Sequence, residues 1–152
     1  MLAIMTAIHA LAAVVWVGGM FFAYMALRPS VGPLEPPVRV ALWARVFGRF
    51  FPWVWLAVLV LLASGFWIIF GEWGGFANAG HHVHVMLLLG LIMMALFAHL
   101  YFAPFKRLRA AVAAGDTPGA AKQIAMIRMI VATNLVLGLL TVIIGASGRY
   151  WG

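Results

Sequence analysis

Long apolar runs that contain almost no charge decide what this chain can fold into. Apolar residues make up 66% of the chain, charged residues 9%, and the mean hydropathy is +1.10, which lies outside the range of soluble domains. An apolar helix of about 20 residues spans the hydrocarbon core of a bilayer, so a chain of 152 residues has room for about four spans. We therefore predict an all-α fold, an integral membrane four-helix bundle that forms a single transmembrane domain over residues 1–152.

Prolines, glycines and basic residues mark the ends of the spans. Arg28 and Pro29 follow the first apolar run, and four prolines between residues 28 and 39 predict a loop there. A stretch rich in Gly and Trp follows the second run, and Pro104 is expected to end the third helix. The predicted membrane helices are about 2–27, 40–70, 81–102 and 120–146.

The basic residues predict how the chain crosses the membrane. They gather in two connections, between the first and second helices and between the third and fourth, whereas the connection between the second and third helices has none. Lys and Arg collect on the cytoplasmic side of membrane proteins. We therefore expect both termini to lie outside, in a multi-pass protein of the bacterial inner (cytoplasmic) membrane. The same residues are topology signals, so we expect no nucleic-acid partner. They are Arg28, Arg39, Arg45, Arg49, Lys106, Arg107, Arg109 and Lys122.

Four of the five histidines fall in one predicted leaflet of the membrane. His81, His82 and His84 open the third helix, and His9 lies about 10 Å inside the first helix from the same outer side. An ionisable residue in a bilayer is costly, so it indicates ligand, proton or ion handling. His99 lies about 22 Å further along the third helix and is expected at the opposite interface.

Several classes of chemistry are excluded by what the chain lacks. Because it has no cysteine, it forms no disulfide, thiolate metal site or iron–sulfur cluster. Glu35, Glu72 and Asp116 all fall in expected loops, and no catalytic triad or nucleotide-binding loop is present. The histidines are therefore the main candidates for a site.

Two ligands suit histidines in a membrane bundle. Axial imidazoles from two helices can hold a b-type haem; here they would be His9 and His84, with Trp16 flanking the ring and the small Ala13 leaving room. The role would then be electron transfer or membrane redox chemistry, which requires a redox partner or a quinone and leaves a membrane oxidoreductase activity open.

Copper is the alternative, since imidazole and thioether groups both bind it. His81, His82 and His84, with His9 at a similar depth, would collect the ion. Methionines such as Met20, Met25, Met86, Met93 and Met94 would pass it inward. A structural or assembly role, with interfacial histidines, is a third possibility. Small residues on the helix faces permit a homodimer, and Asn134 is expected to bond across helices.

Several motifs resemble the copper-resistance D (CopD) family of bacterial membrane proteins. They are residues 9–22 with Leu27, Arg28 and Pro29 behind them, the stretch Arg49-Phe50-Phe51 with Ala63-Ser64-Gly65, and residues 127–138. The resemblance implies a minimal four-helix version of that family, which handles copper.

The first-helix pattern is also similar to the membrane protoporphyrinogen oxidases. That resemblance implies haem b bound through His9, although the third helix here lacks the lysine of those enzymes. On balance the sequence favours haem b between the first and third helices, with copper as the alternative.

Overall fold

The computed structural model describes residues 1–150, and all regular structure in this part of the chain is helical. Four of its continuous helices are long and apolar enough to cross a membrane. This confirms the predicted all-α, four-span membrane fold. The spans are Leu2–Ser30, Pro36–Glu72, His81–Ala113 and Thr117–Ser147.

Each of the first three spans joins an α-helix to a π-helical turn. The elements are α1 (Leu2–Phe22), η1 (Ala23–Leu27), α2 (Arg28–Ser30), α3 (Pro36–Trp67), η2 (Ile68–Glu72), η3 (Phe76–Asn78), α4 (His81–Leu100), η4 (Tyr101–Phe105), α5 (Lys106–Ala113), α6 (Thr117–Ser147) and η5 (Gly148–Tyr150).

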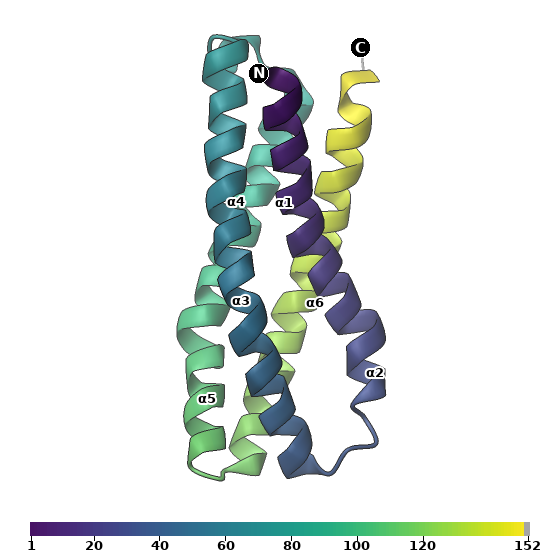
Figure 1. Ribbon diagram of the computed structural model, residues 1–152, viewed down its shortest axis with the longest axis vertical. Coiled ribbons are helices and arrows are strands. Elements are labelled where there is room, and N and C mark those ends of the chain that lie inside the picture. The colour runs from purple at the N-terminus through teal and green to yellow at the C-terminus, as the bar shows by residue number, and fades with distance from the viewer. Residues whose placement is uncertain (151–152) are drawn as a thin grey trace.

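The spans run antiparallel along the chain (Figure 1). Helix α1 packs along α3, α4 packs along α6, and α6 also contacts α1 and α3. The N-terminus, the α3–α4 connection and the end of α6 lie at the top of Figure 1, whereas α2 and α5 lie toward the bottom. We call the first of these the histidine end, because His9, His81, His82 and His84 lie in its half of the bundle. The side of the membrane that it faces stays a prediction.

Two helix boundaries differ from the sequence-based prediction because of prolines. Helix α3 begins at Pro36, four residues earlier than expected, since a proline in the first helical turn loses no hydrogen bond. The third span does not end before Pro104 but continues through the π-helical turn η4 into α5. A proline in a helix interior loses an N–H and crowds the preceding turn, and the wider π-helical turn makes room for its ring.

Aromatic packing holds the half of the bundle away from the histidine end. The Phe51 ring lies 5.1 Å from Phe47, 5.5 Å from Phe97 and 4.8 Å from Phe105, measured between ring centroids. Such pairs each contribute about 0.5–1.5 kcal/mol beyond the area they bury. By contrast, residues 2–11, 81–92 and 139–147 include no buried side chain. The bundle is therefore tightly packed at one end and more open at the histidine end.

Substitutions at two adjacent glycines of α1 can test the packing of α1 against α3. A Cβ on Gly19 would overlap the Phe50 ring of α3, whereas a Cβ on Gly18 meets no atom within 4 Å. We expect Gly19→Leu to lower the free energy of unfolding by about 1–3 kcal/mol, the usual cost of overpacking. Gly18→Leu should not lower it, because its side chain points to open space. Unfolding by SDS in mixed micelles measures both variants, and equal stabilities would contradict this packing.

Candidate functional site

His9 is held by a hydrogen bond between α1 and α3. Its Nδ1 atom lies 2.8 Å from the Ser64 hydroxyl oxygen. That hydroxyl donates its only hydrogen to the Val60 carbonyl at 2.6 Å, so the hydrogen between Ser64 and His9 must belong to the imidazole. Nδ1 is therefore the donor, and Nε2 keeps its lone pair. A histidine oriented in this way presents Nε2 as a ligand.

Gly65 makes room for the His9 ring beside Ser64. A Cβ on Gly65 would lie 3.3 Å from Cε1 of His9, closer than most real Cβ contacts. The pair Ser64 and Gly65 thus supplies an acceptor for the ring and a space next to it. His9 is half-buried by this arrangement, and Ser64 is buried.

The three histidines that open α4 differ in their surroundings. His81 and His84 are exposed. His84 donates from Nδ1 to the Gly80 carbonyl at 3.2 Å, so its Nε2 also stays available, and its ring lies 6.0 Å from the Phe76 ring. His82 is partly buried, because its side chain lies against Gly148 at the end of α6. His82, rather than His84, therefore contacts the fourth span.

The structure gives His9 and His84 different partners. His9 bonds to Ser64 on α3, whereas His84 bonds to the carbonyl of Gly80, the residue before its own helix. Trp16, expected beside a haem ring, is buried edge-on against Phe97 at 6.1 Å, and Ala13 is partly exposed. Within residues 1–150, no three His, Asp or Glu side chains form a group that could hold a metal ion. The pairing of His9 with His84 stays a prediction.

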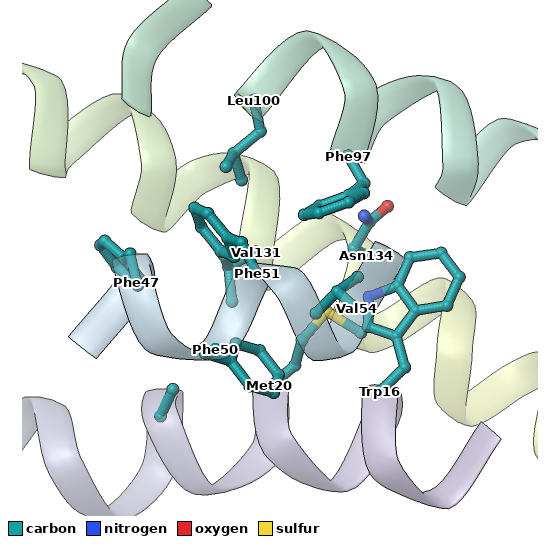
Figure 2. Close-up of a pocket in the computed structure, with 11 residues that line it drawn as sticks. Trp16, Met20, Phe47, Phe50, Phe51, Val54, Phe97, Leu100, Val131 and Asn134 are labelled. Atoms are coloured by element: carbon teal, nitrogen blue, oxygen red, sulfur yellow. The ribbon is translucent and has the colours of Figure 1, made fainter. Parts of the chain in front are cut away.

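A small cavity lies where all four spans meet (Figure 2). Its volume is about 20 Å³, whereas pockets for cofactors have volumes of about 300–1,000 Å³. It therefore has no room for a porphyrin. Its lining residues are Trp16, Met20, Ala23, Phe47, Phe50, Phe51, Val54, Phe97, Leu100, Val131 and Asn134.

A larger cavity, of about 440 Å³, lies around η4 and α5, at the end of the bundle opposite the histidine end. No histidine lines it, so it offers no imidazole to a haem. The predicted haem b site thus has no support in either cavity. The lining residues are Tyr101, Phe102, Phe105, Lys106, Arg109 and Ala110.

The methionines of the described residues fall into two groups by burial. In the first group, Met20 and Met93 are buried, and Met5, Met86, Met94 and Met126 are partly buried. Met25 and Met129 are 57% and 69% exposed on the outside of the bundle. Only the first group can offer a thioether to an ion inside the protein.

A family model described as Copper resistance protein D, CopD, matches residues 44–147, about two thirds of the chain. The chain belongs to the CopD family. The resemblance to CopD is thereby confirmed, whereas the similarity to protoporphyrinogen oxidases stays a prediction. No curated protein and no solved structure matches the chain. The residues that match CopD include Ser64, His81, His82 and His84, and His9 lies before them.

Sequence reasoning did not identify the partner of His9 or the residues that face His82 and Met86. Ser64 lies as close to the end of the second span as His9 lies to the start of the first, so equal depth was an available signal. Gly138 and Gly145 are spaced by seven residues, a pattern of small residues that favours close helix approach. The CopD motifs had drawn attention to Ser64 without giving it a role.

The hydrogen bond between His9 and Ser64 can be measured by a double-mutant cycle. We expect His9→Ala and Ser64→Ala to be coupled by about 0.6 kcal/mol, the average for hydrogen bonds between membrane helices. Unfolding of the two single variants and the double variant in SDS gives the coupling energy. Additive effects would show that the two side chains do not interact.

Proposed function

We propose that this CopD-family chain binds copper and transports it across the membrane, and that the ion enters at the histidine end. Membership of a copper-resistance family and four membrane-spanning helices support a membrane protein that handles copper. The observation that carries the proposal is that four histidines lie in the half of the bundle at the histidine end, two of them with Nδ1 bonded and Nε2 available.

Imidazole nitrogen suits the capture of copper from water. It is one of the neutral ligands that suit copper. A hydrogen bond from Nδ1 to a carbonyl or hydroxyl oxygen fixes the ring and raises the basicity of Nε2. His84 and His9 both have such a bond. The exposed His81 and His84 would bind the ion first, and the partly buried His82 would receive it next.

The lipid bilayer is the environment that the four spans require. Buried side chains are sparse near the histidine end, where α1, α4 and α6 include exposed apolar residues. Lipid would cover these surfaces, and a second copy of the chain is the other occupant that the small residues permit. Neither occupant changes which side chains face one another inside the bundle. A homodimer, a redox partner and a quinone stay predictions from the sequence.

Copper entry in proteoliposomes tests the proposal. We expect replacement of His81, His82 and His84 together by Ala to lower the entry rate by at least about tenfold, the size of loss that even the outer partners of metal ligands can cause. His99→Ala is the matched control, because His99 is an exposed histidine near the other end of the same helix. A native rate in the triple variant, or an equal loss in the control, would contradict the proposed entry site.

The absorption spectrum of the same purified protein separates copper from haem. The copper proposal predicts that protein from haem-replete cells shows no Soret band and that metal analysis finds copper after loading. A Soret band that disappears in His9→Ala would instead support the haem hypothesis. The dithionite-reduced spectrum is the measurement, with His99→Ala again as the control.

A further inference from the structure

Helix α4 presents two methionines to glycines on α6 and a histidine to Gly148, the residue that follows α6. A Cβ on Gly145 would lie 2.8 Å from Cε and 3.3 Å from Sδ of Met86. A Cβ on Gly138 would lie 3.1 Å from Cε of Met93 and 2.8 Å from a methyl group of Val17 on α1. His82 lies against Gly148 in the same way. Because these glycines have no side chains, the three side chains of α4 can contact the backbone of the fourth helix and of Gly148. We call His82, Met86 and Met93 the soft-ligand row.

The soft-ligand row leads from the histidine end to the middle of the bundle. Its members are spaced by four and seven residues, which places them on one face of α4. The spacing corresponds to about 6 Å and about 10 Å along the helix axis. Burial increases along the row, from the partly buried His82 and Met86 to Met93, which is 3% exposed.

The inner end of the row adjoins the central cavity. The Met93 carbonyl accepts a hydrogen bond at 3.1 Å from the Asn134 amide nitrogen. Asn134 lines the cavity together with Met20, and Figure 2 shows that the two come from different helices. Oδ1 of Asn134 is buried and has no hydrogen-bond partner among residues 1–150. A buried polar atom without a partner is unusual in an apolar core, and it leaves the Asn134 amide oxygen free to accept a contact beside this cavity.

Gly90 leaves a gap in the row between Met86 and Met93. It lies four residues after Met86 and three before Met93, so it shares their face of the helix. A Cβ on Gly90 would meet no atom within 4 Å. Methionine has three rotatable bonds, and this space lets the two thioethers swing toward one another.

We propose that the soft-ligand row is a path for Cu(I), from the imidazole of His82 to the thioethers of Met86 and Met93 and on to Met20 at the central cavity. This inference rests on the proposed copper function and specifies the form of the ion and its route. Thioethers are soft neutral ligands that select Cu(I). The ion exchanges one neutral ligand for the next, and it stays Cu(I), so no electron or proton moves.

Removal of the thioether sulfurs tests the path. Leu has nearly the volume of Met, and this exchange is among the best tolerated in protein cores. We expect Met86→Leu and Met93→Leu each to lower Cu(I) affinity by about tenfold or more, measured under ascorbate by competition with a chromophoric chelator. Met25→Leu and Met129→Leu, which change exposed methionines, should bind Cu(I) as the native chain does. X-ray absorption at the copper edge should show sulfur ligands whose number falls in the double variant M86L/M93L, which keeps only the Met20 thioether of the path.

A second variant distinguishes a continuous Cu(I) path from two independent Cu(I) sites at Met86 and Met93. Gly90→Leu keeps all the ligands but fills the gap between them. We expect it to retain Cu(I) binding and to slow Cu(I) entry into proteoliposomes by about tenfold or more, as loss of a ligand partner does. Gly18→Leu makes the same change at an exposed position of α1 and should leave entry unchanged. Native entry in Gly90→Leu would overturn the path.

The outcomes distinguish failure of the path from failure of the copper function. If the native chain binds and transports Cu(I) but Met86→Leu and Met93→Leu do so equally well, the soft-ligand row is wrong and the copper function stands. If the native chain neither binds nor transports copper, both are wrong. Circular dichroism and gel filtration of each variant show whether it is folded, and Met93→Ile replaces Met93→Leu if the latter is not.

Discussion

In a bilayer, every polar group of the backbone must find its partner within the protein, and the rest of this structure depends on that constraint. It explains why three spans continue as π-helical turns instead of opening into loops. It also explains why most polar side chains in the spans bond to their own helix, as Thr133 does to Met129 and Thr141 to Leu137. Two side chains reach across instead: His9 bonds to Ser64, and Asn134 to the Met93 carbonyl.

These two hydrogen bonds between helices lie at different levels of the bundle and have different roles. His9 joins α1 to α3 near the histidine end and presents a free imidazole nitrogen. Asn134 joins α6 to α4 at the centre, beside the cavity, and its amide oxygen has no partner among the described residues. The expectation that Asn134 bonds across helices is thereby confirmed. Gly145 of α6 lies against Met86 of α4, and Gly138 of α6 lies against Met93 of α4 and Val17 of α1, so a side chain at either glycine would crowd these contacts. Membrane helices associate through such close packing, because lipid tails are as apolar as the helix surfaces and the hydrophobic effect does not favour helix association.

Hydropathy was sufficient to predict the four spans, because an apolar segment of about 20 residues has few stable structures other than a membrane-spanning helix. It did not predict the helical path through Pro104, because a proline usually ends a helix in water, where solvent satisfies the freed carbonyl. The sequence also could not predict which neighbouring helix each histidine side chain faces. His82 and His84 differ by two positions and so point in opposite directions, and which of them meets α6 depends on how the helix is rotated. Rotation is set by contacts such as Met86 on Gly145, which arise only once the two helices pack.

The uneven packing of the bundle suits the exchange of ligands. Rings around Phe51 fix one half of the bundle, and the absence of a buried side chain in residues 81–92 leaves the first half of α4 more freedom. An ion that moves between ligands needs side chains that change rotamer at low cost, and methionine loses less than a branched side chain when it does so. Burial increases from His82 to Met93 while the ligand changes from nitrogen to sulfur. Along the proposed path, loss of water would therefore be accompanied by softer ligands, which favour Cu(I) over harder ions.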